Sequence, residues 1–363
     1  MLYRILKYPL LLCTLLLSLL LLSAGATAWV RPSTTMAFTY LGLAFPAIAL
    51  SNALAAAYWI LKRKWYVVIP VCSLILSSHN LQKTIGIHKN NPAEKVITDK
   101  IKVLSYNVKL FNFYDKNSKV PDYLLKQDAD IVCLQEFGYH TGKEKRFLTR
   151  SDIMDKLRAK YPYHHFSQSE LQMKGTYGMA TFSKHPILKH EEIAIESRYK
   201  SAIYSDVVLG SDTIRIFNLH LESNKLTSTE RDMLQHLRRH GDSTNSKAKA
   251  INKKLSEAYS LREKQADKVA ELVEKTHYPI ILCGDINDVP VSYTYSTLAS
   301  DKLTDAFTEK GRGYGHTFNE GNIKFRIDDI MHSKQLYVKK YVRDKVPYSD
   351  HYPIITELAW NKQ

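Results

Sequence analysis

The sequence predicts an α/β fold in which two β-sheets pack together as a sandwich, preceded by apolar helices long enough to cross a membrane. The first observation is that short apolar runs, about 4–8 residues each, alternate with turns and a few helical patterns from Ile101 onward. Many strands with helices between them favour two sheets in one domain. The second observation is a set of polar residues at the ends of these runs, and the third is the apolar character of residues 1–80.

Three apolar segments fill residues 1–80, which we predict to be a membrane region with two or three transmembrane helices. Pro9 to Trp29 is almost continuous leucine and alanine, and Phe38 to Leu61 is long enough to span the ~30 Å hydrocarbon core. Trp65 to Ser78 is a shorter, weaker candidate. The first segment fits either a transmembrane helix or a signal peptide with a cleavage-like site at Ala26-Thr27-Ala28. The helix is favoured because further apolar segments follow.

Positive charge predicts the orientation of this region. Lys62-Arg63-Lys64 lies between two apolar segments, and Arg4 and Lys7 precede the first one, so both groups should stay in the cytoplasm. Three spans then place residues 101–363 on the non-cytoplasmic face of a multi-pass inner-membrane protein, and cleavage of the first segment gives the same result. If Trp65 to Ser78 only dips into the interface, the domain faces the cytosol instead. The lipid bilayer is a predicted partner, and no protein partner can be inferred.

The formal net charge of +15 is shared unevenly along the chain. Residues 1–100 carry a net +8, which leaves +7 for residues 101–363. A basic balance suits a polyanion or an anionic bilayer, although positive-inside loops account for over half of the excess. Four cysteines are too few for a disulfide scaffold. Residues 81–100 are polar and without clear periodicity, which predicts a linker to a domain spanning residues 101–363.

Residues 223–259 form a basic stretch that we expect to be a helical insertion. It fits either a solvated helical hairpin or an arm that guides a phosphate-bearing substrate or touches anionic lipid. Its cations are Lys225, Arg231, Arg238, Arg239, Lys247, Lys249, Lys253 and Lys254.

Periodicity in the remaining domain predicts three helices and two further strands. The helices are expected at residues 123–127, 151–161 and 260–275. Tyr177 to Phe182 and Ala202 to Val208 read as successive strands of one sheet, and Tyr177 and Gly178 are expected to serve sheet packing.

The most informative polar group follows the apolar run Ile280 to Cys283. The run stops at Gly284 and is followed by Asp285-Ile286-Asn287. A strand here would deliver a carboxylate and an amide, two residues apart and facing the same way, to the mouth of a sheet. Four other strand-like runs and one short C-terminal segment end in polar residues: Asn107, Glu136, His220, Asp328 and the pair Asp350-His351. Together these residues predict a site that hydrolyses phosphate esters.

These motifs occur in the order seen in the endonuclease/exonuclease/phosphatase superfamily, and the resemblance covers about residues 101–360. The motifs are Ser-Tyr-Asn107, Leu-Gln-Glu136, Asn-Leu-His220-Leu, Gly-Asp285-Ile-Asn287, Arg-Ile-Asp328 and Ser-Asp350-His351. The resemblance implies a four-layer α/β/β/α sandwich of two mixed β-sheets, as in deoxyribonuclease I. It also implies a Mg²⁺ ion, with Mn²⁺ as an alternative.

The resemblance further implies a role for each residue. Glu136 would bind the metal, with Asn107 close by and Asp350 near the ion. Asp285 would orient and deprotonate the attacking water, and Asn287 would donate to a non-bridging phosphate oxygen.

The two histidines complete the implied set. His351 would donate to the phosphate, held in its tautomer by Asp328, and His220 would contact the phosphate or the leaving group.

The sequence therefore predicts a membrane-anchored, metal-dependent phosphodiesterase, most simply of nuclease type. The alternatives are a phosphodiesterase of sphingomyelin or phospholipid headgroups and an inositol-phosphate phosphatase. An alternative of a different class is a catalytically silent module that binds a phosphate ligand.

Overall fold

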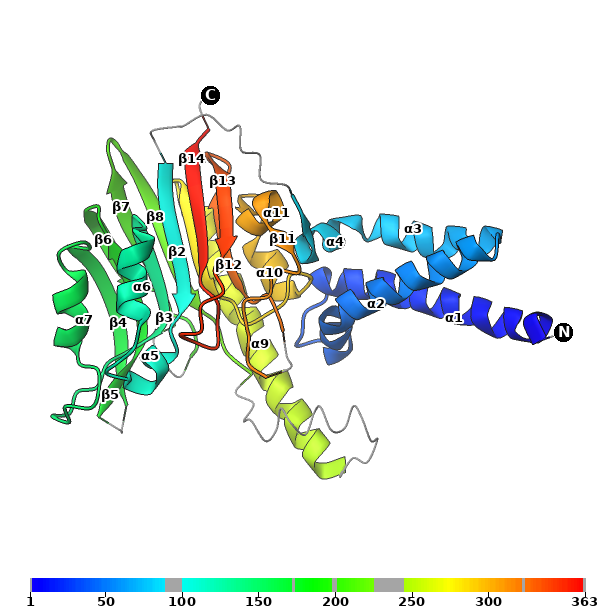
Figure 1. The fold of residues 1–363 in the computed structure, drawn as a ribbon, viewed down its shortest axis with the longest axis horizontal. Coiled ribbons are helices and arrows are strands. Elements are labelled where there is room, and N and C mark those ends of the chain that lie inside the picture. Colours follow the sequence, from blue (N-terminus) through cyan, green and yellow to red (C-terminus); the bar gives the residue numbers. More distant parts are fainter. Residues whose placement is uncertain are drawn as a thin grey trace.

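Two six-stranded mixed β-sheets form the centre of the molecule (Figure 1). The computed structural model describes residues 2–88, 100–171, 174–197, 201–224, 245–321 and 324–361. In the first sheet the strand order is β13-β14-β2-β3-β5-β4, and in the second it is β10-β12-β9-β8-β7-β6. The pairs β2–β3 and β8–β9 are parallel, and the other neighbours are antiparallel.

The strands of the first sheet are β2 (Lys100–Asn107), β3 (Ile131–Phe137), β4 (Tyr163–Leu171), β5 (Gly175–Ser183), β13 (Leu336–Arg343) and β14 (Ile354–Trp360). Those of the second are β6 (Ile187–Glu192), β7 (Ala202–Leu209), β8 (Asp212–His220), β9 (Ile280–Asp285), β10 (Leu303–Asp305) and β12 (Asp328–Ser333). The helices among them are α5 (Lys109–Tyr114), α6 (Val120–Gln127), α7 (Arg150–Leu157), α9 (Asn245–Lys275), α10 (Tyr293–Leu298) and α11 (Ala306–Lys310).

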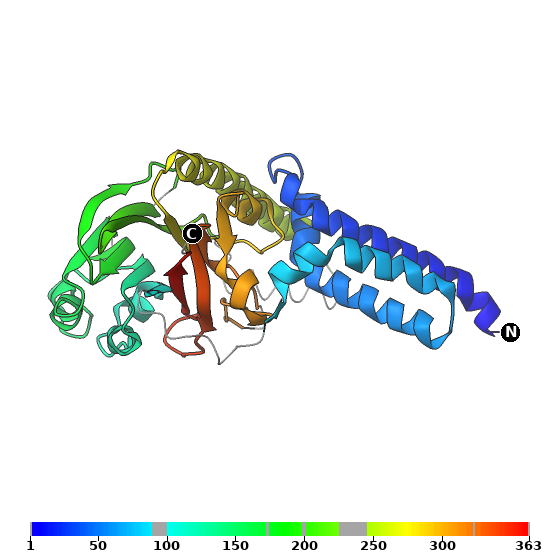
Figure 2. The same cartoon turned by 90° about the horizontal axis from the view of Figure 1, so that it is seen from above.

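Three buried apolar layers hold this arrangement together. The layer between the sheets contains Val103, Ile216 and Cys283. A second layer packs α6 and α7 on the outer face of the first sheet, and a third packs α9 and α10 on the outer face of the second. The predicted four-layer α/β/β/α sandwich of two mixed sheets is confirmed, and Figure 2 shows the helices on the outer faces.

The predicted helices are present, with shifted ends. They correspond to α6, to α7, which ends at Leu157, and to α9, which begins earlier, at Asn245. Residues 245–259 of the expected basic insertion are thus the first half of α9, and residues 225–244 lie outside the described residues.

The prediction that residues 177–182 and 202–208 belong to one sheet is wrong. They lie in β5 and β7, which belong to different sheets. The chain leaves β5 at Ser183, turns, and starts β6 at the edge of the second sheet. The sequence did not predict β4 and β6, because β4 is largely polar and β6 is mostly exposed, so neither contains a long apolar run.

The N-terminal segments form a helical bundle that projects away from the sandwich (Figures 1 and 2). Its elements are α1 (Leu2–Gly25), η1 (Ala26–Trp29), α2 (Met36–Leu61), η2 (Trp65–Val67), α3 (Val68–Leu76) and α4 (Ser78–Thr84). Among the described residues, Tyr8–Trp29 and Met36–Leu61 are long and apolar enough to cross a membrane, whereas Trp65–Leu76 is shorter.

Residues 81–87, the first part of the predicted linker, lie mostly in regular secondary structure. Residues 81–84 end helix α4, and β1 (Gly86–Ile87) pairs with β11 (Arg312–Gly313) of the sandwich. Residues 89–99 lie outside the described part of the chain.

Candidate active site

The carboxyl ends of the four parallel-paired strands meet at one edge of the sandwich. Asn107 ends β2, His220 ends β8 and Asp285 ends β9, while Glu136 is the next-to-last residue of β3. In the register of the second sheet His220 and Asp328 flank Asp285 on either side. The sheet itself therefore sets a row of three functional side chains.

Two of the predicted residue groups begin strands instead of ending them. Asp328 is the first residue of β12, and His351 lies shortly before β14. Both strands run antiparallel to a strand that ends in the site, β12 to β9 and β14 to β2. The residues at or just before the start of β12 and β14 therefore reach the same edge. The apolar runs alone do not show the direction of a strand, so they could not predict this.

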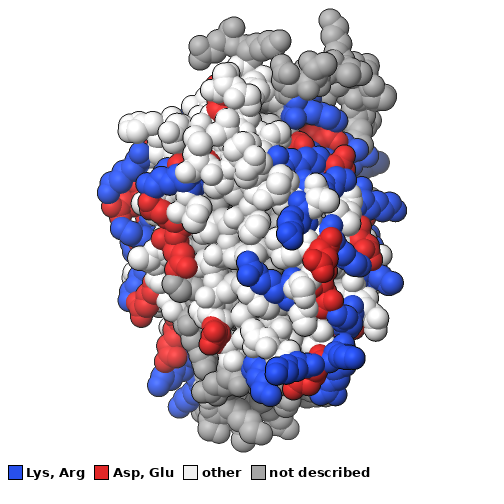
Figure 3. Space-filling view, turned by 90° about the vertical axis from the view of Figure 1, so that its left-hand side faces the viewer, with Lys and Arg blue, Asp and Glu red and all other residues white. Residues whose placement is uncertain are grey.

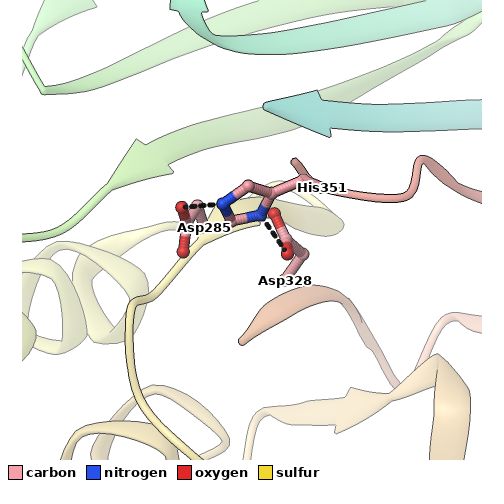
Figure 4. A group of neighbouring side chains, drawn as sticks. All are labelled: Asp285, Asp328 and His351. Atoms are coloured by element: carbon pink, nitrogen blue, oxygen red, sulfur yellow. Dashed lines mark hydrogen bonds and ion pairs between the residues drawn. The ribbon is translucent and has the colours of Figure 1, made fainter. Parts of the chain in front are cut away.

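His351 lies between two carboxylates (Figure 4). Its Nδ1 is 2.8 Å from Asp328 Oδ2, and its Nε2 is 3.7 Å from Asp285 Oδ2. Burial opposes the charged ring, but the Asp328 and Asp285 carboxylates outweigh it and raise the pKa of His351 to about 10. The ring is therefore an imidazolium at neutral pH, with its Nε2–H toward Asp285.

Asp285 is buried and held on both carboxylate oxygens. Asn107 Nδ2 donates to Oδ2 at 3.0 Å, and the backbone N–H of Asn287 donates to Oδ1 at 3.0 Å. Burial, together with the charge of Asp328, raises the pKa of Asp285 from its ordinary value near 3.8 to about 6. At pH 7 it is mostly a carboxylate that can still accept a proton.

Asn287 does not follow strand alternation, because β9 ends at Asp285. It has a left-handed backbone (φ 55°), and its Nδ2 donates to the Leu221 carbonyl at 3.0 Å. Asp285 and Asn287 are thus joined by a tight turn, so strand alternation does not set the direction of the Asn287 side chain.

Glu136 enters the site through a bulge. The β3–β5 register shifts between Leu134 and Phe137, and Glu136 has φ 48°. Such irregularities re-aim side chains beside active sites. Asn107 Nδ2 donates to Glu136 Oε1 at 3.2 Å, and burial raises the pKa of Glu136.

His220 faces both acidic groups of the site. Its Nε2 lies 3.7 Å from Glu136 Oε1 and 3.7 Å from Asp285 Oδ2. Its Nδ1 is 3.0 Å from the hydroxyl of Tyr177, and burial lowers its pKa. At neutral pH the ring is therefore uncharged. Tyr177, which was expected only to pack in the sheet, orients it.

Asp350 is paired with a lysine that the sequence did not single out. Lys109 Nζ is 2.7 Å from Asp350 Oδ2 and 3.6 Å from Glu320 Oε1. Burial works against the charged carboxylate, but His351 and Lys109 hold the pKa of Asp350 below its usual value.

Residues 109–114, which include Lys109, all have positive φ, between 46° and 65°. Backbone strain of this kind persists where surrounding structure enforces it, often at functional sites.

A buried polar network supports the site from below. Gln135 Nε2 donates to Asn218 Oδ1 at 2.8 Å and links β3 to β8 between the sheets. The backbone N–H groups of Ile327 and Asp328 donate to Thr317 Oγ1. Gln135 and Asn218 were visible as polar residues inside apolar strand motifs, whereas nothing near Lys109, Tyr177 or Thr317 marked them.

The donor set can be tested for a metal ion. Among the described residues, Asp285, Asp328 and His351 bring ligand atoms within 4.8 Å of one another. That group fits a metal poorly, because the imidazolium already lies between its carboxylates. Glu136 fits better, since burial raises the pKa of its carboxyl group and a bound cation would offset that cost, and Asp350 is the other anionic oxygen source nearby. Asn107 turns its Nδ2 toward Glu136 and its Oδ1 toward the N–H of Lys109, so here it orients carboxylates.

Comparison with known proteins gives the family and the fold of the chain. A model of the endonuclease/exonuclease/phosphatase family matches residues 104–351, and residues 4–84 match a domain of unknown function (DUF8431). No curated protein matches the chain.

Two solved structures show the same fold. One is an endonuclease/exonuclease/phosphatase from Beutenbergia cavernae DSM 12333, with a TM-score of 0.53, 17% identity and 72% of each chain covered. The other is a family protein from Leptotrichia buccalis C-1013-b, with a TM-score of 0.50, 15% identity, and 72% of this chain and 100% of that one covered. At such identities the likeness shows the fold alone. Because the family model covers more than half of the sequence and its motifs meet at one edge of the expected sandwich, the chain belongs to the endonuclease/exonuclease/phosphatase family.

Proposed function

We propose that this protein is a membrane-anchored, divalent-metal-dependent phosphodiesterase. The observation that supports the proposal best is the row of His220, Asp285 and Asp328 with His351 seated between the two carboxylates. A raised carboxylate pKa beside a raised imidazole pKa provides a base and an acid at neutral pH. A module that only bound phosphate would not need a buried, water-activating carboxylate.

In this proposal Asp285 accepts the proton of the attacking water as the new P–O bond forms and the P–O bond to the leaving group breaks. The departing oxygen then takes a proton from solvent water. His351 donates from Nε2 to the phosphoryl group, and Asp328 keeps it charged and oriented through Nδ1. His220, neutral and oriented by Tyr177, donates from Nε2 to a phosphate or leaving-group oxygen. Asn287 donates to a non-bridging oxygen with the amide hydrogen that Leu221 does not take.

Glu136 and Asp350 would hold the divalent cation, with Mg²⁺ the first expectation and Mn²⁺ the alternative. When bound there, the ion would neutralise charge on the phosphate oxygens. Lys109 would hold Asp350 in place by an ion pair. Asn107 would fix the positions of the Glu136 and Asp285 carboxylates by donating to both.

Nucleic acid is the substrate class we favour. In the described part of residues 101–361, the large exposed apolar side chains are scattered: Phe113, Tyr163, Leu188 and Tyr278. They form no apolar hairpin that would enter a bilayer to reach a phospholipid headgroup. The net charge of +7 on residues 101–363 suits a polyanion, but the described basic and acidic side chains are mixed on the face opposite the bundle (Figure 3), so the nucleic acid is not expected to bind on that face.

We propose that the bundle anchors the domain on the non-cytoplasmic side of the inner membrane. Leu12, Leu16 and Leu19 of α1 and Leu50 and Leu54 of α2 are exposed, as lipid-facing residues would be. The chain start and the loop that contains Lys62-Arg63-Lys64 both lie at the end far from the sandwich (Figure 1). Positive charge at that end would keep it in the cytoplasm.

The test is to incubate the full-length protein in detergent with DNA, RNA, sphingomyelin and inositol phosphates, each with and without Mg²⁺. Cleavage of nucleic acid only with Mg²⁺ is expected. Cleavage of sphingomyelin alone would favour the phospholipid candidate. Binding of any of these without turnover would favour the silent module.

A further inference from the structure

The two loops that present Asp285 and Asp328 are packed into the membrane bundle. Val289 and Val291 follow Asp285 closely, and both are buried in one apolar cluster with Leu21 and Ala24 of α1 and Phe45 and Ala49 of α2. Phe325, three residues before Asp328, packs against the same cluster. Side chains that flank the acid–base pair are therefore part of the core of the bundle.

A buried arginine makes a second, polar link between the bundle and the site. Arg326 Nη2 donates to the carbonyl oxygen of Lys83 in α4 at 2.8 Å. Its Nη1 pairs with Asp305 at 2.9 Å and with Asp329 of β12. Its guanidinium also lies 4.4 Å from the ring centre of Phe307. One fork thus joins α4 to the strand that begins at Asp328.

The apolar cluster and the Arg326 contacts both hold the two backbone segments that carry Asp285 and Asp328. The Ile286 N–H donates to the Ile327 carbonyl at 2.8 Å, so the loop after Asp285 and the residue before Asp328 are bonded to each other. Any shift of Val289, Phe325 or Arg326 relative to the bundle is transmitted through at most four residues to Asp285 or Asp328. The His351 Nε2 to Asp285 contact of 3.7 Å depends on both loops.

We infer that the membrane bundle is a positioning element of the active site and more than a tether. Phe45 of the bundle and Arg326 of the sandwich are the positioning residues: Phe45 is a core member of the cluster that buries the two valines, and Arg326 links the start of β12 to α4. Correct alignment of Asp285 and His351 then requires the folded bundle, so turnover is coupled to the state of the membrane-embedded helices. This inference rests on the proposed function only where turnover is its readout.

The experiment compares Phe45→Ala and Arg326→Lys in the full-length protein in lipid nanodiscs. Lysine keeps a cation for Asp305 and Asp329 but loses the bond to the Lys83 carbonyl, and Phe45→Leu is the conservative rescue. Leu50→Ala is the matched control on the same helix, because Leu50 is 62% exposed. Leu157→Ala controls for lost stability, because Leu157 is the buried last residue of α7 and belongs to a different core cluster.

We expect kcat on a diester that the wild type cleaves to fall at least tenfold in Phe45→Ala and Arg326→Lys, with KM within twofold. Hydrogen exchange at the Ile286 and Asp328 amides should accelerate in both, while Phe45→Leu and both controls resemble the wild type.

Equal kcat and equal exchange in Phe45→Ala and Leu50→Ala would overturn the inference, as would an equal loss of kcat in Leu157→Ala. If Arg326→Lys does not fold, Phe45→Ala decides. Hydrogen exchange needs no substrate. A wild type that cleaves no diester would therefore refute the proposed function, while exchange at the Ile286 and Asp328 amides would still test whether the bundle positions the two loops.

Discussion

Asp285 and His351 face each other across 3.7 Å with opposite charges at neutral pH. Each perturbs the other: the carboxylate helps raise the pKa of the ring, and the ring partly offsets the burial that raises the pKa of the carboxylate. A pair of this kind separates acid from base within one hydrogen-bonded row.

Replacing either member should abolish most turnover without unfolding the protein. We expect Asp285→Asn and His351→Ala each to lower kcat by on the order of 10²-fold or more, because each removes a proton-transfer group from the reacting centre. Both side chains are buried, so the melting temperature of each variant is measured to show that the protein is folded at the assay temperature. His185→Ala is the control and should keep full activity. Near wild-type kcat in either variant would show that its assigned role is wrong.

The pH profile of kcat/KM should be a broad bell. A raised carboxylate pKa means that the base form of Asp285 is lost as pH falls through about 6, so the rate should fall tenfold per unit below that value. The acid form of His351 should persist up to about pH 10. Asp328→Asn removes the carboxylate that stabilises the imidazolium and should move the upper limb downward. An upper limb that stays fixed in Asp328→Asn would contradict the assignment of His351.

Much of the site was predictable from the sequence because its residues sit next to short apolar runs in a fixed order. Lys109 and Tyr177 were not, because each acquires its meaning from a partner far along the chain, Asp350 or His220. The turn at Asn287 was not predicted, because the pattern of apolar residues does not show that β9 ends two residues earlier.

At the scale of elements, antiparallel pairing explains why both strand ends and strand starts supply the site. The sequence pattern predicted strands and helices well where apolar residues recur, and it failed where strands are polar, as in β4 and β6. It also could not assign strands to sheets, since the apolar pattern of β5 and β7 does not show which neighbours each strand pairs with.

Helix α1 is tied to the rest of the bundle by buried polar bonds. Ser18 Oγ donates to Asn52 Oδ1 at 2.9 Å, and Trp59 Nε1 donates to Thr14 Oγ1 at 2.9 Å. Ser73 Oγ of α3 reaches the same Asn52 oxygen at 3.2 Å. Loss of α1 would leave Trp59 Nε1 without its acceptor and would remove the Leu17 carbonyl to which Asn52 Nδ2 donates, which is costly in an apolar interior.

We therefore expect α1 to be retained and not cleaved as a signal peptide. The intact mass of protein purified from membranes should include residues 1–28. Ala28→Leu, which removes the small residue of the cleavage-like site, is the control and should differ from the wild type only by the substitution. A mature N-terminus at Trp29 in the wild type, absent in Ala28→Leu, would contradict this prediction.

At the scale of the whole molecule, the bundle and the sandwich share an apolar cluster and lie end to end (Figure 2). The chain start and the Lys62-Arg63-Lys64 loop lie at the end of the bundle far from the sandwich, whereas the loops of the catalytic edge pack against the near end of the bundle. A bilayer around the bundle would therefore separate these basic groups from the active site, as the charge rule requires.

Protease added to intact spheroplasts should remove the catalytic domain. The physical reason is that the loop containing Lys62, Arg63 and Lys64 resists crossing, so the segments on either side of it end on the outer face. A cytosolic protein that stays intact controls for leakage. Protection of the domain until lysis would refute an outer location and make a cytosolic nucleotide substrate the better expectation.

The central claim, a metal-dependent diester hydrolysis at this edge of the sandwich, is tested most directly with bis(4-nitrophenyl) phosphate. Full-length protein is assayed in excess EDTA and then across a Mg²⁺ titration, with Glu136→Gln in parallel. We predict no turnover in EDTA, recovery with Mg²⁺, and a requirement for at least tenfold more Mg²⁺ in Glu136→Gln, because the variant loses an anionic oxygen. Full turnover in EDTA, with no increase on adding Mg²⁺, would contradict the claim.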